Sequence, residues 1–262
     1  MSNDIVLEVR NATKRFGPVL ALDSINLTAR RGEVLALLGD NGAGKSTLIK
    51  CISGVHQFDA GEIVLDGMMS PIKSPADARS AGIETVYQDL ALFDNLTPAQ
   101  NFYAGRELSG PRWLPMGLRF LSTREMDRRT ADVLDRLKVV LPKRDATVAL
   151  MSGGQRQAVA VARASVFARK VVILDEPTAA LGLRESRKVL DLVAQLRDEG
   201  NAVILITHNM EHVTELASRA MVLRQGRKVG EIVPTKSNQQ ELVSMIVGAA
   251  TADQFVQPDR AG

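Results

Sequence analysis

The sequence predicts an α/β fold with a mostly parallel central sheet. Short runs of β-branched residues alternate with helical patterns along the 262-residue chain. Two of these runs, Val171–Leu174 and Val203–Ile206, are apolar at every position, which is typical of strands covered by helices on both faces. The predicted strands are residues 5–9, 34–38, 63–65, 85–87, 171–174, 203–207 and 220–223.

One region interrupts this alternation. Residues from about 93 to 168 contain few strand-like runs, and Thr123–Lys138 has apolar residues at the mixed spacing of a helix. The segment Gly110–Ser122 is too broken by proline and glycine for a long helix. We therefore expect one main domain over residues 1–235, with a mostly helical subdomain inserted at about 93–168.

The last segment, residues 236–262, is expected to form a short helix and a frayed tail. Ser237–Gln240 resembles a capping box that opens the helix. Leu242, Met245 and Ile246 share one helical face, and Gly248 is expected to stop the helix before the tail begins beyond Ala249.

Composition excludes several classes of protein. With 45% hydrophobic and 24% charged residues, the chain lacks the bias of a disordered protein. A formal net charge of only +3 gives no reason to expect nucleic acid as a partner. Cys51 is the single cysteine, so no intrachain disulfide can form, and its apolar neighbours predict a buried thiol. No run approaches the roughly 18 apolar residues of a membrane span, and residues 1–10 lack an apolar signal core, so we expect a cytoplasmic location.

The clearest chemical signal is the segment Gly39–Ser46, which matches the pattern G-x-x-x-x-G-K-S/T. It follows the predicted strand 34–38 and precedes a helical pattern, which is the context that this pattern requires. Glycines let backbone amides curl round phosphate oxygens, Lys45 would reach the terminal phosphates, and Ser46 would ligate magnesium. The expected phosphate-binding residues are Gly39, Asp40, Asn41, Gly42, Ala43, Gly44, Lys45, Ser46 and Thr47.

Two acids follow the predicted strand 171–174. Asp175 comes at its end, and Glu176 is followed by Pro177. At such a position one carboxylate can hold magnesium while the next orients an attacking water. An Asp-Glu pair alone is more often a solvated turn, but the apolar run before it and the proline after it favour a catalytic role.

The segment Met151–Gln157 reads Met-Ser-Gly-Gly-Gln-Arg-Gln. Its serine, its glycine amides and the N-terminus of the helix that follows would form a second anion-binding surface. The segment resembles the ABC signature, usually written L-S-G-G-Q, with Met151 in place of leucine. Over roughly residues 5–235 the chain resembles the ATPases of ABC transporters. That resemblance implies a P-loop NTPase core with an inserted helical subdomain and an antiparallel β subdomain.

The resemblance also implies roles for single residues. Phe16 matches the aromatic residue that stacks on adenine, and Gln88 matches the glutamine that contacts magnesium and water. His208 matches the histidine that contacts the γ-phosphate and helps to hold water near Glu176. The expected cofactors are ATP and Mg²⁺. The implied catalytic residues are Glu176, His208 and Gln88, and the implied magnesium ligands are Ser46, Gln88 and Asp175. In the family two ATPase subunits form a dimer, and the signature of one contacts the ATP held by the other. The residues implied for that contact are Ser152, Gly153, Gly154 and Gln155.

A second position departs from the family pattern, besides Met151. The segment Ala179–Gly182 ends in glycine, whereas the corresponding D-loop normally ends in aspartate. This removes a carboxylate from the implied dimer interface and puts the coupling of the two ATP sites in doubt. The same ending, with the phosphate loop and the segment Arg156–Ala164, looks like bacterial monosaccharide importers of the ribose, xylose and fructose type.

Such importers imply several partners. The chain would form a sandwich dimer with a second copy or a homologous ATPase subunit. Integral membrane permease subunits would dock in grooves around Gln88 and Asp89–Asn101, and an extracytoplasmic sugar-binding protein would act indirectly. The chain would then be a peripheral protein at the cytoplasmic face of the inner membrane.

Several alternatives remain open at this point. The segment His208–His212 reads H-x-x-E-H, a zinc pattern, but that pattern needs both histidines on one helical face, and His208 follows an apolar strand. An exporter ATPase shares the motifs. A non-transport ABC ATPase acting on ribosomes or DNA shares them too, although such proteins usually add a second cassette, a coiled coil or a basic extension. A generic P-loop kinase or GTPase leaves the signature unexplained.

Overall fold

The computed structural model describes residues 4–110, 120–141, 143–179 and 181–248. Most of the segment Gly110–Ser122 and the expected tail beyond Ala249 lie outside the described residues. The chain divides into two compact units. The first comprises residues 1–88, 167–177 and 193–262, and the second comprises residues 89–166 and 178–192. The second unit thus takes a short stretch after Pro177 in addition to most of the region in which few strands were expected.

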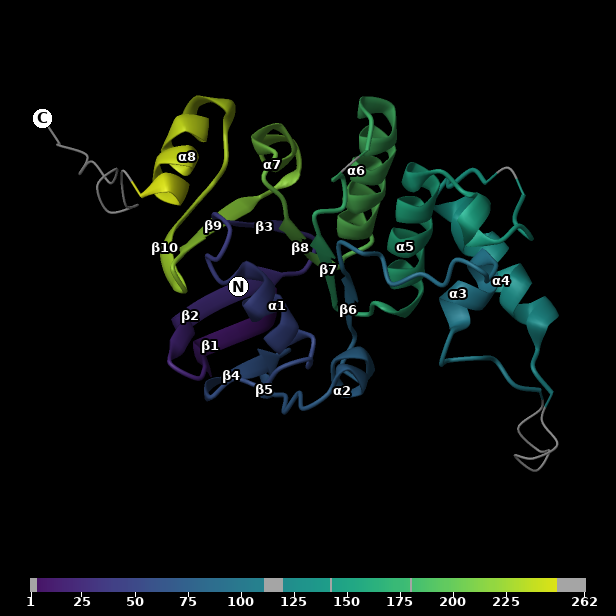
Figure 1. The fold of residues 1–262 in the computed structure, drawn as a ribbon, viewed down its shortest axis with the longest axis horizontal. Coiled ribbons are helices and arrows are strands. Elements are labelled where there is room, and N and C mark those ends of the chain that lie inside the picture. The colour runs from purple at the N-terminus through teal and green to yellow at the C-terminus, as the bar shows by residue number, and fades with distance from the viewer. Residues whose placement is uncertain (1–3, 111–119, 142, 180, 249–262) are drawn as a thin grey trace, which may run out of the picture. The chain divides into compact units, whose positions relative to one another are not determined.

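A six-stranded sheet forms the centre of the first unit, in the order β10-β9-β3-β8-β7-β6 (Figure 1). All neighbouring strands in it are parallel except β9 and β10. The parallel sheet predicted from the apolar runs is therefore confirmed, with small shifts at the strand ends. The strands are β3 (Val34–Leu38), β6 (Ile83–Val86), β7 (Val171–Asp175), β8 (Ala202–Ile206), β9 (Arg219–Arg224) and β10 (Arg227–Ile232).

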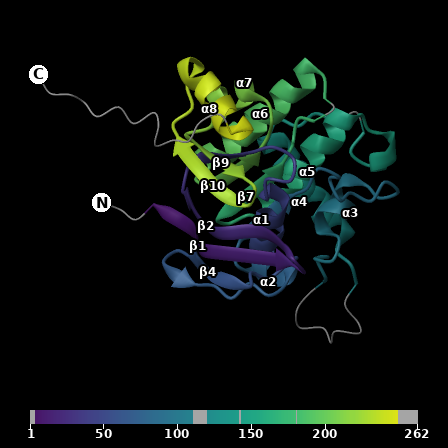
Figure 2. The ribbon, with the colours of Figure 1, turned by 60° about the vertical axis from the view of Figure 1, so that its left-hand side comes forward.

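A second sheet in the same unit is antiparallel, in the order β2-β1-β4-β5. Figure 2 shows β1, β2 and β4 side by side. The sequence predicted only residues 5–9 and 63–65 of this sheet, and it missed β2, β5 and β10 as strands. Buried and exposed positions alternate along much of β2, so it has no continuous apolar run. The strands are β1 (Ile5–Phe16), β2 (Val19–Arg30), β4 (Ala60–Leu65) and β5 (Met68–Met69).

Each face of the six-stranded sheet has its own apolar core. One core joins Leu35 and Leu37 of β3 to α1 (Lys45–Ile52) and to the antiparallel sheet. The other core joins Ala36 and Leu38 to the helices α7 (Met210–Leu216) and α8 (Gln239–Val247). Successive β3 side chains point to opposite cores, and for this reason the whole strand is apolar.

The start of α8 differs from the prediction. Ser237 does not cap this helix, whose N-cap is Asn238. The side chain of Asn238 accepts a hydrogen bond from the amide of Thr235 (2.7 Å) and thereby closes the short 3-10 turn Lys236–Asn238 that precedes the helix. The expected stop at Gly248 is confirmed, since this residue has the left-handed backbone (φ 96°) common at helix ends.

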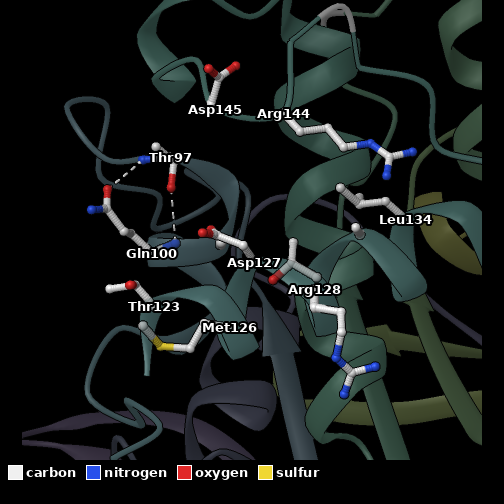
Figure 3. Close-up of a pocket in the computed structure, with 12 residues that line it drawn as sticks. Thr97, Gln100, Thr123, Met126, Asp127, Arg128, Leu134, Arg144 and Asp145 are labelled. Carbon is white, nitrogen blue, oxygen red and sulfur yellow. Dashed lines mark hydrogen bonds between the residues drawn. The ribbon is translucent and has the colours of Figure 1, made fainter. Parts of the chain in front are cut away.

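The second unit is built from helices. Its short helix α3 (Pro98–Tyr103) begins with a capping box in which Thr97 and Gln100 exchange hydrogen bonds of 2.9 and 3.3 Å, drawn in Figure 3. The helix α4 (Thr123–Arg136) confirms the helix predicted there. The unit also contains most of α5 (Gly153–Phe167), the start of α6 (Leu183–Asp198) and the 3-10 turn Val148–Leu150. The short helix α2 (Pro75–Ser80) belongs to the first unit. In the part of the chain that the structure describes, no helix combines the length and the apolar character needed to cross a membrane.

A largely buried ion network ties both sheets of the first unit together. The guanidinium of Arg219 on β9 contacts Glu33 (2.8 Å) and Glu231 (2.6 Å), and it donates to the carbonyl oxygen of Thr28 on β2 (3.1 Å). Burial favours the neutral form of Glu231, but hydrogen bonds from Lys228 and Arg219 outweigh burial and lower the pKa of its carboxyl.

Candidate active site

Four parallel strands end at one edge of the central sheet, and each is followed by a predicted site residue. Gly39 follows β3, Gln88 follows β6, Glu176 follows β7 and His208 follows β8. Because β3, β8, β7 and β6 are neighbours in that order, their carboxyl ends meet at this edge. Ligands of α/β sheets bind at such edges.

Two glycines of the loop between β3 and α1 are required by close contacts. A Cβ atom on Gly39 (φ 148°) would lie 2.3 Å from the carbonyl oxygen of Leu223. A Cβ atom on Gly44 (φ 103°) would lie 2.8 Å from the carbonyl oxygen of Ala21. Only glycine fits both positions. The loop therefore turns tightly into α1, whose N-terminal amides and dipole favour an anion.

The amine of Lys45 folds back over this loop. Its Nζ atom donates hydrogen bonds to the carbonyl oxygens of Gly39 (2.6 Å) and Asp40 (3.1 Å). A pocket of about 320 Å³ lies beside the loop, which is within the range of small-molecule sites. It is lined by the predicted residues from Asp40 to Thr47 and by Val19, Leu20, Ala21, Gln225 and Gly226.

The last five of these lining residues were missed by sequence reasoning. They lie at the start of β2 and in the turn between β9 and β10, which carry no motif. Among these five residues, only Gly226 has a structural requirement for its residue type, because a Cβ atom there would lie 2.7 Å from the carbonyl oxygen of Ala21. In the sequence it is one glycine among 20.

The structure brings Glu176 and His208 together. The Nδ1 atom of His208 lies 3.0 Å from Oε1 of Glu176, with the imidazole 81% exposed and the carboxylate side chain only 17% exposed. Glu176 also has a left-handed backbone conformation (φ 51°), which is strained for a residue with a side chain. Its amide still donates to the carbonyl oxygen of Ile206 (2.9 Å), so the end of the sheet holds this conformation in place.

Asp175, at the end of β7, is a partly buried acid at the same edge. Burial raises the pKa of its carboxyl, and the negative charge of Glu176 raises the pKa further, while Lys45 and Lys50 act in the opposite direction. Carboxylate oxygens are among the ligands that Mg²⁺ prefers, so Asp175 can contribute one such ligand at this edge. Gln88, the other expected magnesium ligand outside the phosphate loop, is exposed directly after Tyr87.

The predicted signature belongs to the second unit, whereas the phosphate loop belongs to the first. Ser152 and Gln155 form a capping box at the start of α5: Ser152 N donates to Gln155 Oε1 (2.9 Å), and Gln155 N donates to Ser152 Oγ (3.3 Å). Gln155 thus has a structural role that the sequence interpretation did not foresee. Gly153 and Gly154 occupy the first turn, where backbone amides have no partner within the helix.

Phe16 ends β1 and is 43% exposed, which leaves ring surface for a planar partner. The His56 ring packs edge-on against it, with centroids 5.2 Å apart, and Lys14 Nζ lies 5.5 Å from its centroid. Lys14 is itself held by Asp59 at 2.8 Å. His56 belongs to no sequence motif, and its contact with Phe16 is seen only in the structure.

The H-x-x-E-H segment does not adopt the geometry of a helical zinc site. His208 lies before Asn209, the N-cap of α7, whereas His212 lies within that helix. The two imidazoles therefore do not share a helical face, and His208 is instead in contact with Glu176.

Comparison with known proteins identifies the family. The ABC transporter family profile matches residues 22–179. The chain is 45% identical over 250 residues to the fructose import ATP-binding protein FrcA of Rhizobium meliloti, covering 95% of this chain and 96% of that protein. This chain belongs to the ABC transporter family. It is an ABC ATPase, a nucleotide-binding enzyme that hydrolyses ATP.

Other relatives of this ABC ATPase agree. The xylose/arabinose import ATP-binding protein XylG of Sulfolobus acidocaldarius is 44% identical, over 94% of this chain and 95% of its own length. The ribose import ATP-binding protein RbsA of Yersinia pestis is 43% identical over 95% of this chain, which spans only 48% of that protein.

Solved structures confirm the fold of the ABC ATPase. A nucleotide-free ATP-binding cassette from an ABC transporter matches 91% of this chain and 95% of its own, with a TM-score of 0.77 and 25% identity. A cassette of the cbiONQ transporter complex from Clostridium perfringens matches 94% of this chain and 93% of its own, with a TM-score of 0.73 and 28% identity. The predicted P-loop NTPase fold of the ABC type is thereby confirmed, whereas the roles of single residues stay predictions.

Proposed function

We propose that this ABC ATPase drives the import of a monosaccharide through separate membrane subunits. Its similarity to the fructose and xylose/arabinose import proteins, along nearly the whole of each, carries the proposal. The glycine at position 182, with the phosphate loop and the segment Arg156–Ala164, supports the same class. An exporter subunit and a non-transport ABC ATPase are the competing functions, and no observation on this chain favours either.

For hydrolysis, we assign Glu176 as the base that orients water and His208 as its partner near the γ-phosphate. Their contact at 3.0 Å supports this pairing. The loop Gly39–Thr47 would bind the phosphates, with Lys45 exchanging its bonds to backbone carbonyls for bonds to phosphate oxygens. Phe16 would stack on adenine with its exposed face.

The donor set at this edge fits Mg²⁺. Asp175, Ser46 and Gln88 offer a carboxylate, a hydroxyl and an amide oxygen, which are the hard ligands that magnesium prefers. A cation would also offset the cost of keeping the carboxylate of Asp175 charged, since burial raises its pKa. When bound, Mg²⁺ would neutralise charge on the phosphates of ATP.

The presence of two different anion-binding segments in one chain supports a dimer. One chain carries a single phosphate loop and a single signature, and they belong to different units. We propose that Ser152, Gly153, Gly154 and Gln155 of one subunit contact the ATP held by another. The first-turn amides of α5 supply the donors for that contact.

A pocket of about 530 Å³ in the second unit supports docking of a membrane partner (Figure 3). Met126, Ala131 and Leu134 of α4 contribute apolar lining. Thr130, only 3% exposed, also lines the pocket, and its hydroxyl has no hydrogen-bond partner among the described residues. A partner helix that inserts an apolar side chain would fill the pocket against these apolar residues.

Charge gives this pocket a preference. Arg128 is paired with Glu125, and Arg144 is paired with Asp135. Asp127 and Asp145 also line the pocket, and within the described ranges neither has an ion-pair partner. We expect a basic residue on the docking segment of the membrane subunit. Such docking would hold the ATPase at the cytoplasmic face of the inner membrane.

Purification of the tagged chain from native membranes tests the transport assignment. Mass spectrometry should identify a multi-helix permease and a secreted sugar-binding protein, which can then be screened against monosaccharides. Ribosomal or DNA-repair proteins in place of a permease would overturn the transport assignment and leave the ATPase assignment in force.

A pocket-filling variant tests the docking surface. Ala131→Phe should abolish copurification of the permease while the isolated chain hydrolyses ATP at the wild-type rate. Val140→Phe, which adds the same ring at an exposed position outside the pocket lining, serves as the control and should retain the permease. Equal retention by both variants would show that the permease docks elsewhere.

A further inference from the structure

The first turns of α5 and α6 are joined by one side chain, that of Glu185. This glutamate lies in the first turn of α6, and Gly154 lies in the first turn of α5. A Cβ atom on Gly154 would lie 2.6 Å from Cγ and 2.9 Å from Cβ of Glu185. Real Cβ atoms do not approach so closely, so the apolar stem of Glu185 rests directly on the backbone of Gly154.

The charged end of the same side chain points to a different place. A Cβ atom on Gly182 would lie 2.8 Å from Oε2 of Glu185. Gly182 starts α6, since its carbonyl accepts the bond from Ser186 N (2.9 Å). A carboxylate here is favoured by the positive end of the α6 dipole. The carboxylate therefore stays at its own helix start, while the stem lies on α5.

This arrangement explains the glycine that departs from the family pattern. A side chain at position 182 would occupy the space taken by the Glu185 carboxylate. Aspartate there would place two negative charges in contact, which is unfavourable. Gly182 and Glu185 are thus a matched pair, in which the carboxylate at this helix start comes from the third position of the helix.

We propose that Glu185 is a positioning residue for the signature turn, holding Gly154 in place through its stem while its carboxylate is anchored at Gly182. The capping box of Ser152 and Gln155 fixes the start of α5 from within the helix. Glu185 fixes the same turn from outside. The proposal rests on the proposed function, because it is ATP contact by this turn that the positioning serves.

Three substitutions separate the stem from the charge. Glu185→Ala removes both, and Glu185→Gln keeps the stem and removes the charge. Gly182→Asp with Glu185→Ala moves the carboxylate to position 182 without restoring the stem. Glu241→Ala, which removes a first-turn acid from α8, is the control for a general effect on helix starts.

The readouts are the KM and kcat of ATP hydrolysis and the ATP concentration that half-saturates dimerisation in a Glu176→Gln background. Glu185→Ala should raise both KM and the half-saturating ATP concentration about tenfold, which is the loss of affinity expected when one weak contact is removed. The kcat of this variant should be retained. Glu185→Gln should stay within about twofold, because the stem is retained. ATP binding to the single chain, measured with a fluorescent analogue, should be unchanged in both.

The double variant tests the matched pair. Gly182→Asp alone should impair dimerisation more than Glu185→Ala does, and adding Glu185→Ala to it should recover part of the loss. Wild-type values for Glu185→Ala, or a double variant no better than Gly182→Asp, would overturn the inference. A wild-type chain that does not dimerise with ATP would overturn the proposed function instead, and thermal melting identifies any variant that has lost its fold.

Discussion

His208 and Glu176 meet at 3.0 Å, although they follow different strands and lie 32 positions apart in the chain. The imidazole is mostly exposed and the carboxylate mostly buried, so the histidine can contact a ligand while it orients the acid. The sequence assigned Glu176 from the acid pair that follows its strand and His208 only by resemblance, and this contact joins the two.

Glu176→Gln should abolish most turnover without loss of ATP binding. The amide has the shape of the carboxylate but cannot act as a base, and a general base contributes about 10²- to 10⁴-fold to a rate. Phosphate release measured alongside binding of a fluorescent nucleotide checks this. Turnover close to that of wild type would remove Glu176 from its proposed role.

The losses from Glu176 and His208 should not add. Because the two side chains act through one contact, His208→Ala should slow the wild-type enzyme but have little further effect in the Glu176→Gln background. A double-mutant cycle on kcat measures this coupling. Independent, multiplied losses would mean that the contact has no part in hydrolysis.

The backbone at Glu176 should carry measurable strain. Its φ of 51° favours glycine, so Glu176→Gly should be more stable to unfolding than Glu176→Ala by about 1 kcal/mol. Both variants lose the carboxylate, and therefore the difference isolates the backbone. Equal denaturation midpoints in urea would show that the conformation is relaxed in the folded chain.

Arg219→Met should lower the free energy of unfolding by about 3 kcal/mol, because it leaves Glu33 and Glu231 without their shared partner in a site where they are largely buried. Acid should have a similar but smaller effect on the wild type. The pKa of Glu231 is below its ordinary value of 4.5 in the folded chain, so its stabilising contribution is complete above that pH and is lost as the pH falls further. Urea titrations at neutral and acid pH check both, and the pH effect at Glu231 should shrink in the variant.

Cys51 should react only when the chain unfolds. Burial raises the pKa of its thiol from 9.0 to about 11, and the side chain is only 1% exposed. At pH ~8 the thiolate fraction is then about 100-fold lower than for a free cysteine, before any steric protection is counted. Alkylation by iodoacetamide, followed by mass spectrometry with and without urea, checks this, and rapid labelling of the folded chain would contradict it.

The sequence predicted the parts of the fold that rest on continuous apolar runs. The strands around Val34–Leu38 and Val203–Ile206 are buried on both faces, so their composition alone identified them. The strand Val19–Arg30 escaped because buried and exposed positions alternate along it, so it has no continuous apolar run, although Gly17 and Pro18 mark a turn directly before it. The capping role of Asn238 escaped because several polar residues in a row could each serve as the cap.

For the site as well, the sequence predicted the parts whose chemistry is local and missed the contacts between distant segments. The loop Gly39–Ser46 was predictable because its chemistry is local in sequence. The contacts of Phe16 with His56, and of Gly154 with Glu185, join residues from distant segments, and no spacing rule relates them. Gln155 was assigned to ATP contact by resemblance, while its capping bond to Ser152 became visible only in the structure.

The junctions between the two units have one more consequence. The chain leaves the first unit directly after Gln88, and again after Pro177, the residue next to Glu176. Two of the four chain crossings between the units therefore lie no more than one residue from a residue at the sheet edge. Each of these two crossings is a short covalent tether between the second unit and that edge. Inserting two glycines after Gln88 would slacken one tether and leave every side chain of the site in the chain.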